Sequence, residues 1–224
     1  MVNSVKSLFC AGLMVVLPRM SQHRNDELNP WQHTREGDGI TVYTRGGESS
    51  GFKEIKATVT LECSLQTLVG ALTDYGNYKN WIYSTTDSYT ITKVSDLENT
   101  VYQYIDAPWP LSDRDVCMRI KVTQDPKSLT VTIDSKSENT LKEYIGGVVR
   151  VPYNYAHWDI VPIAKNKLSC TYFLKTNPGG AIPAWTANMF ITDGPYESIL
   201  KLKTVEIKKP LYLNHKNTKI KEKY

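Results

Sequence analysis

The chain has 224 residues, 41% of them hydrophobic and 22% charged, which suits one globular domain with a sizeable core. Its net charge of +4 is concentrated at the two ends. Residues 1–20 contribute Lys6 and Arg19, and residues 208–224 contribute six lysines and one glutamate, so residues 21–207 carry −3. An acidic central region without a basic stripe argues against nucleic acid as the main partner.

The N-terminal segment predicts export. Lys6 precedes an apolar run over residues 8–17, which is too short to span a bilayer comfortably but typical of a signal peptide. We expect residues 1–21 to be a signal peptide, the alternatives being an uncleaved anchor or a misassigned start codon, with a linker over 22–30. An exported protein would be periplasmic or extracellular; without the signal it would be cytoplasmic.

The next region predicts two strands and a helix. Residues 30–36 fit a short helix or an extended arm, and residues 40–44 and 52–61 alternate as strands do. In the second strand Ile55, Ala57, Val59 and Leu61 are expected to face inward. Ser64 can cap a helix that ends near residue 75, and residues 78–81 form a short helical or turn segment.

A meander of strands follows, with turn signals between the runs and an ambiguous segment at 138–147. The strand-like runs are 88–94, 100–107, 115–123, 129–135, 149–161 and 168–176. A turn at Pro178-Gly179-Gly180 then introduces a final helix from Pro183 to about Lys208, kinked at Gly194-Pro195. Apolar residues recur along it at helical spacing, and this seam packs either over a pocket or into a dry core.

The element order predicts an α+β fold in which a curved antiparallel sheet wraps around the long C-terminal helix. Residues 31–208 form the domain, and residues 209–224 are expected to be a basic, solvated tail. Cys63, Cys117 and Cys170 are too few and too scattered for a zinc site and are expected to be buried free thiols. We expect no metal and no cofactor.

Catalytic motifs are scarce. The sequence has no nucleophile elbow, no P-loop and no dinucleotide-binding fingerprint. His157 and Asp159 share a strand face and could act as acid and base, although a structural or pocket-wall hydrogen bond is the favoured interpretation. In the run Asp113-Arg114-Asp115, the favoured interpretation is a structural ion pair made by Arg114.

Two motifs resemble the START (StAR-related lipid-transfer) domain family. Residues 109–115 (WPLSDRD) resemble its loop-to-strand signature, and residues 177–188 resemble its D-P-G-G-x-I-P-x-W-x-x-N entry to the C-terminal helix, with Asn177 in place of Asp. The resemblance spans residues 31–208. It implies the helix-grip fold of the Bet v 1-like superfamily, with a tunnel that holds one lipid or other hydrophobic molecule.

Some START members place an acidic and a basic residue inside the tunnel. By neighbourhood, Asp106 and Arg119 are the candidates here, whereas Arg114-Asp115 is expected to be structural. The C-terminal helix would act as a lid with a hinge at Gly194-Pro195, and the loop at 107–111 would gate entry. The candidate cavity-wall residues are Trp109, Met118, Ile120, Tyr155, His157, Tyr172, Trp185 and Met189.

We therefore predict a noncatalytic, monomeric protein that binds a lipid or other hydrophobic small molecule, for transport or sensing. The basic tail is an option for transient contact with an anionic membrane. The first alternative is a helix-grip enzyme of the cyclase or aromatase type, in which His157 with Asp159, or Arg119, does acid–base work. The second is a module that binds a protein partner through its acidic body or exposed tyrosines.

Overall fold

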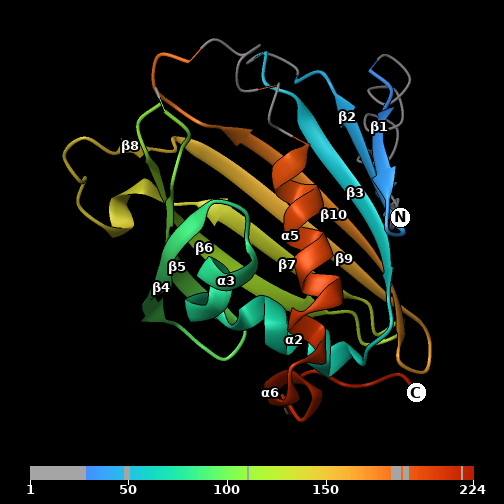
Figure 1. Cartoon of the computed structure of the whole chain (residues 1–224). Coiled ribbons are helices and arrows are strands. Elements are labelled where there is room, and N and C mark those ends of the chain that lie inside the picture. The colour runs from blue at the N-terminus through green and yellow to red at the C-terminus, as the bar shows by residue number, and fades with distance from the viewer. Residues whose placement is uncertain (1–28, 48–50, 110, 183–187, 189–191, 218) are drawn as a thin grey trace, which may run out of the picture. The chain divides into compact units, whose positions relative to one another are not determined.

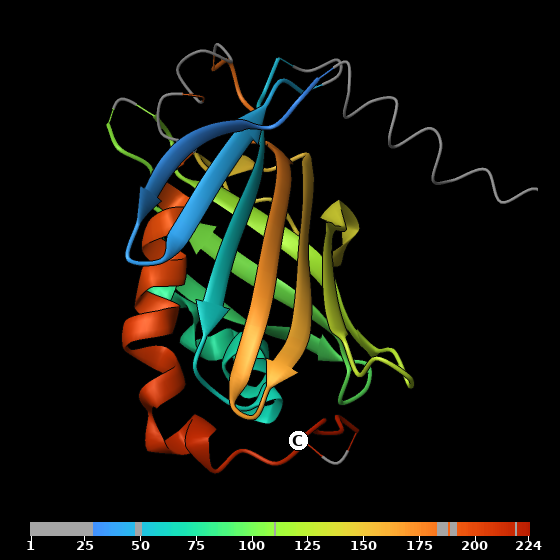
Figure 2. The ribbon, with the colours of Figure 1, turned by 90° about the vertical axis from the view of Figure 1, so that its right-hand side faces the viewer.

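One curved sheet of ten strands organises residues 32–224 (Figures 1 and 2). The computed structural model describes residues 29–47, 51–109, 111–182, 188, 192–217 and 219–224. The expected signal peptide, almost all of the linker, and the candidates Trp185 and Met189 lie outside the described residues. Within the described part, no helix has the length and apolar composition needed to cross a bilayer.

The strands follow the order β1-β2-β3-β10-β9-β7-β6-β5-β4, with every neighbouring pair antiparallel, and β8 pairs in parallel with the start of β6. Their bounds are β1 Gln32–Gly37, β2 Ile40–Arg45, β3 Glu54–Leu61, β4 Thr85–Lys93, β5 Glu98–Ile105, β6 Arg114–Gln124, β7 Val131–Ser137, β8 Val149–Arg150, β9 Tyr153–Ala164 and β10 Lys167–Asn177.

The helices gather on the concave side of the sheet and at one end of it (Figures 1 and 2). Their bounds are α2 Leu65–Thr73, α3 Tyr78–Trp81, α5 Asp193–Thr204 and α6 Pro210–Leu213, with 3-10 turns η1 Tyr75–Asn77, η2 Asn139–Leu141 and η3 Glu206–Lys208. The predicted α+β helix-grip architecture is thus confirmed. Ser64 caps α2 as expected, because its hydroxyl oxygen accepts the Thr67 N–H at 3.1 Å.

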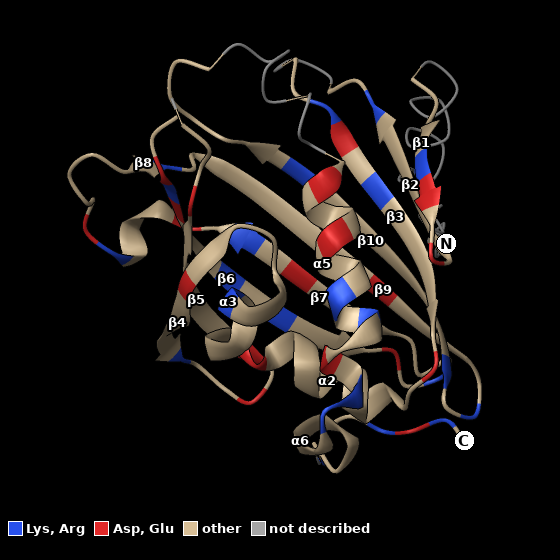
Figure 3. Cartoon of the chain, in the orientation of Figure 1, with Lys and Arg blue, Asp and Glu red and all other residues tan. Residues whose placement is uncertain are grey.

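Period-two alternation sets the inner face of the sheet. The four β3 residues expected to face inward, Ile55, Ala57, Val59 and Leu61, are all buried in the core. Against this face α5 packs Tyr196, Ile199 and Leu202, which are all buried. Acidic and basic residues also lie along α5 (Figure 3). Cys63, Cys117 and Cys170 are buried free thiols, which confirms that expectation.

The start of the predicted last helix, from Pro183 to residue 191, lies outside the described residues apart from Asn188. The described helix α5 begins at Asp193, so Gly194 and Pro195 lie in its first turn. Proline suits a first turn, since its missing N–H has no intrahelical acceptor there. Helix α5 ends at Thr204, and η3 and α6 continue the chain in a new direction (Figure 1).

One strand prediction changes, and one open alternative is decided. Residues 149–161 were expected to be one strand but form β8 and the first part of β9, separated at Val151-Pro152. Strand β8 pairs with β6, whereas β9 pairs with β7 and β10. Residues 32–37 adopt the extended alternative and pair with β2.

The C-terminal segment is packed on the domain, which corrects the prediction of a solvated tail from residue 209. Tyr212 and Ile220 are both only 2% exposed. The Glu222 carboxylate accepts the backbone N–H groups of Leu65 and Gln66 at 3.2 and 2.7 Å, at the start of α2. The buried side chains of Tyr212 and Ile220 and the Glu222 carboxylate therefore hold this lysine-rich segment on the domain.

We expect Glu222→Ala to lower the free energy of unfolding by about 1 kcal/mol, because it removes a carboxylate that caps the first N–H groups of α2. Urea unfolding followed by circular dichroism measures this. Lys216→Ala is the matched control, since Lys216 is exposed and makes no side-chain bond within the described structure. Equal stability of the two variants would show that the C-terminal segment does not cap α2.

Candidate functional site: a pocket between the sheet and helix α5

A cavity of about 270 Å³ lies between the inner face of the sheet and the helices α3 and α5. Its walls come from strands β5, β6, β7, β9 and β10, from Tyr78 and Trp81 of α3, and from the first two turns of α5. This volume is close to the lower limit for sites that bury small organic ligands, which starts near 300 Å³.

Strand alternation decides which residues reach the cavity. Every second residue lines it: Val116, Met118 and Ile120 on β6, Asn154, Ala156 and Trp158 on β9, and Tyr172, Leu174 and Thr176 on β10. The residues between them point to the outer face. The lining is therefore mostly apolar, with a few polar groups at fixed positions.

Three of these polar groups have weak or single partners. The Gln103 amide donates to the Thr85 hydroxyl at 2.5 Å, and the Ser135 hydroxyl donates to the Met118 thioether at 3.2 Å. The buried indole N–H of Trp81 has no acceptor among the described residues. Such groups can fix the orientation of a ligand whose main contacts are apolar. The described residues contain no cluster of three metal-ligating side chains.

The predicted wall residues separate into two groups. Met118, Ile120 and Tyr172 line the cavity. Trp109 instead is 93% exposed, in the loop between β5 and β6, and Asp106 is exposed at the end of β5. Sequence reasoning missed most of the lining, including Trp81 and Ala156. Because alternate residues of β6 share a face, Met118 would have indicated Val116 as a lining residue. Which face of β9 lines the cavity could not be decided without knowing the strands that pair with it.

Tyr155 and His157 lie on the outer face of β9, which corrects their assignment to the cavity. Both contact Asp134 on β7: the Tyr155 hydroxyl donates to Oδ1 at 2.9 Å, and His157 Nδ1 lies 3.0 Å from the same oxygen. His157 Nε2 lies 3.2 Å from Asp159. Because the residues that flank them line the cavity, the strand period places these rings outside it.

Arg119 also lies outside the cavity, on the outer face of β6. Its guanidinium bridges Glu98 at 3.2 Å and Glu138 at 2.8 Å. All three side chains are substantially exposed, so this bridge contributes little to stability. The pair of Asp106 and Arg119, expected to meet a polar ligand group, is therefore not brought into the pocket.

Burial by itself would raise the pKa of Asp134, but the hydrogen bonds from His157 and Tyr155 outweigh it and the pKa is lowered. A lowered folded-state pKa stabilises the native state above the unfolded pKa of about 3.9, and this contribution is lost as the pH falls through the folded value. We expect wild type to lose more stability than Asp134→Asn between pH 6 and 3, measured by urea unfolding. The control is Asp87→Asn, at an exposed position of β4, which should lose as much stability as wild type over this pH range. The prediction would be contradicted if Asp134→Asn also lost as much stability as wild type.

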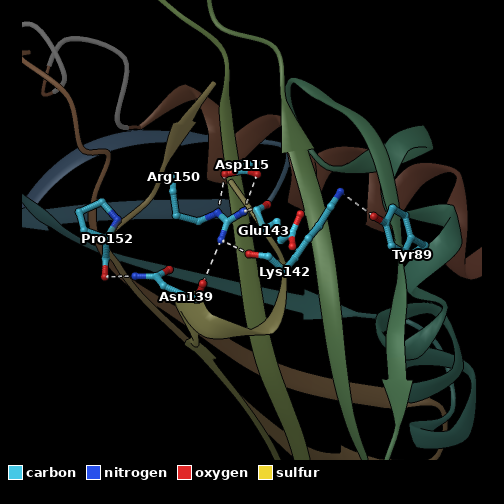
Figure 4. Close-up of polar contacts among 7 residues, drawn as sticks. All are labelled: Tyr89, Asp115, Asn139, Lys142, Glu143, Arg150 and Pro152. Carbon is cyan, nitrogen blue, oxygen red and sulfur yellow. Dashed lines mark hydrogen bonds and ion pairs between the residues drawn. The ribbon is translucent and has the colours of Figure 1, made fainter. Parts of the chain in front are cut away.

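The ion pair expected within residues 113–115 is made by different residues. Adjacent strand residues point to opposite faces, so Arg114 and Asp115 cannot pair. Asp115 instead accepts two hydrogen bonds from Arg150, at 2.6 and 2.9 Å, and both side chains are almost fully buried (Figure 4). Arg150 also donates to the carbonyls of Asn139, Lys142 and Glu143, and thereby fixes the segment that the sequence left ambiguous.

Comparisons with known proteins agree with this architecture, although no protein-family profile matches the chain. An uncharacterised protein of Pseudomonas aeruginosa, PA1579, is 27% identical over 179 residues, covering 80% of this chain and 88% of that protein. Phosphatidylcholine transfer protein of Mus musculus is 29% identical over 168 residues, covering 73% of this chain and 78% of that protein.

Solved structures show the same relationship. A STAR-related lipid transfer protein from Xanthomonas axonopodis superposes with a TM-score of 0.74 at 27% identity, covering 80% of this chain and 99% of that one. Human StAR-related lipid transfer protein 5 gives a TM-score of 0.71 at 19% identity, covering 84% and 91% of the two chains, which is a likeness of fold.

Proposed function

Because this chain is a START-related domain with the helix-grip fold, we propose that it binds a lipid or other hydrophobic small molecule in the pocket under α5 and transfers it between membranes. The relatives named as lipid-transfer proteins support binding and transfer. The observation that carries the proposal for this chain is the apolar cavity itself, which is lined by alternate residues of five strands.

The energetics are adequate without covalent chemistry. Each buried CH₂ group contributes about 0.8 kcal/mol, so ten buried carbons would contribute about 8 kcal/mol before the cost of association. Trp81 and Tyr172 present large ring surfaces to such a chain. The few polar lining groups would then select among ligands of similar length.

The geometry favours binding over the cyclase or aromatase alternative. That alternative assigned acid–base work to His157 with Asp159, or to Arg119. All three have their side-chain contacts on the outer face of the sheet, away from the cavity. The residues to which the cyclase or aromatase alternative assigned acid–base work are therefore not in the cavity lining.

Native mass spectrometry of the purified protein, followed by organic extraction, tests the proposal. We expect a co-purifying lipid of defined mass, and uptake of a fluorescent fatty acid or sterol by the emptied protein. Transfer of the labelled lipid between two vesicle populations would distinguish transport from sensing. A protein that carries nothing and takes up none of these probes would refute the proposal.

A further inference from the structure

Arg114 is a buried cation that forms no ion pair with any residue that the structure describes. Its side chain is 94% removed from solvent, yet its one hydrogen bond in the described structure is from Nη1 to the Ser112 carbonyl. No carboxylate of the described residues lies within 4.0 Å of the guanidinium. Asp113 is engaged elsewhere, since its oxygens accept the Tyr104 hydroxyl at 2.7 Å and the Ala107 N–H at 3.1 Å.

Its position on β6 places Arg114 at the end of the pocket. Arg114 shares the inner face with Val116, Met118 and Ile120, which line the cavity. Its partner across the β5–β6 ladder, Ile105, also lines the cavity. The guanidinium thus continues the inner row of β6 beyond the apolar lining, next to the turn at Gly180.

Arg150 shows how this protein satisfies a buried guanidinium when the purpose is structural. Arg150 pairs with Asp115 on the outer face and donates to three further carbonyls (Figure 4). A guanidinium carries five N–H donors; Arg150 uses all of them, whereas Arg114 makes one hydrogen bond to the described part of the chain. The two buried arginines therefore differ in how many of their N–H donors are hydrogen-bonded.

An unpaired buried charge is costly, and an anion that pairs with it recovers part of that cost. Burial lowers the pKa of the Arg114 guanidinium, an effect that Asp113 partly opposes, but arginine remains protonated in proteins. Its planar fork matches the oxygen spacing of a carboxylate or a phosphate. A carboxylate ends the acyl chain of a fatty acid, and a phosphate lies in the headgroup of a phospholipid.

We propose that Arg114 binds the anionic group of the ligand, a carboxylate or a phosphate, while the acyl chain occupies the apolar cavity. This inference rests on the proposed lipid-binding function and specifies its ligand class as an anionic amphiphile. Arg114 is thus a specificity-determining residue, and Trp81 and the strand residues of the wall supply the contacts that do not depend on charge.

Wild-type selectivity is the first test, since it needs no substitution. Emptied protein is titrated at pH 8 with a fluorescent fatty acid and with the fatty alcohol of the same chain, and then with phosphatidic acid and the matching diacylglycerol. We expect the anionic member of at least one pair to bind about tenfold tighter or more. The pair that shows the preference distinguishes a carboxylate from a phosphate as the recognised group.

Substitutions then locate the preference. Arg114→Met should abolish it while leaving affinity for the neutral member within about threefold, and Arg114→Lys should retain part of it. Arg119→Met is the matched control, because Arg119 lies on the outer face of the same strand and should leave every affinity unchanged. Circular dichroism establishes that each variant is folded.

The outcomes separate this inference from the proposed function. Equal affinity of wild type for both members of each pair would overturn the role of Arg114 but leave lipid binding intact. Equal loss of neutral and anionic ligands in Arg114→Met would also overturn it, since that pattern indicates a structural role. A wild-type protein that binds none of the four probes would refute the proposed function and this inference with it.

Discussion

Replacing Arg150 with methionine is expected to lower the free energy of unfolding by about 3–5 kcal/mol, the usual cost of removing one partner from a buried ion pair. The side chains of Arg150 and Asp115 are 3% and 1% exposed. Methionine keeps the apolar volume but leaves the Asp115 carboxylate buried without its cation. It also leaves three carbonyls of the segment at 139–143 without their donor.

The same change should loosen the segment over the outer face of the sheet. Lys142 on this segment donates to the Tyr89 hydroxyl at 2.8 Å, and Asn139 donates to the Pro152 carbonyl at 3.0 Å (Figure 4). Amide hydrogen exchange of residues 138–147 should therefore accelerate in Arg150→Met. Arg150, on β8, bonds both this segment and Asp115 of β6.

Urea unfolding measures the stability change, with Arg119→Met as the control because its pairs with Glu98 and Glu138 are exposed and contribute little to stability. The double variant Asp115→Leu with Arg150→Met should recover part of the loss, since it removes both buried charges. A loss below about 1 kcal/mol in Arg150→Met would show that the pair does not hold the segment.

Filling the cavity at Ala156 is expected to weaken lipid binding about fiftyfold. Ala156 faces the cavity from the middle of the inner row of β9, so a phenylalanine there occupies part of the 270 Å³ that the ligand needs. A ligand excluded from about three CH₂ positions loses about 2.4 kcal/mol, which corresponds to that factor. Titration of the emptied Ala156→Phe protein with a fluorescent fatty acid measures the effect.

His157→Phe is the control, because it places the same phenyl ring on the next residue, at the opposite face of the same strand. We expect it to leave lipid affinity within about twofold of wild type. The comparison decides directly between the inner row of Asn154, Ala156 and Trp158 and the row that contains His157. The reverse result, with binding lost in His157→Phe alone, would place the ligand on the outer face.

The helix-grip architecture could be predicted from local patterns. Strict alternation over 52–61 and the turn signals of the meander indicated an antiparallel sheet, and an apolar seam indicated a helix packed across it. Each of these signals arises within a few residues of chain. Apart from β1, β8 and β9, the observed strands and the helices α2 and α3 lie close to their predicted ranges.

The site was only partly predictable, because a period of two fixes which residues share a face but not which face is buried. Met118, Ile120 and Tyr172 were placed with the lining, whereas Tyr155 and His157 belong to the outer row. The face of β9 follows from its pairing with β7 and β10, whose partners lie far apart in sequence.

The sequence by itself determined the fold class, most of the strands in chain order and the cap at Ser64, since these follow from residue periodicity and backbone preference. Tertiary structure alone decided the partners of the charges. Asp115 pairs with Arg150 and not with its neighbour Arg114, and Glu222 reaches the start of α2 across more than 150 residues. Such pairs depend on which strand faces and chain ends lie close together in space. Residue periodicity along the chain does not determine those long-range contacts.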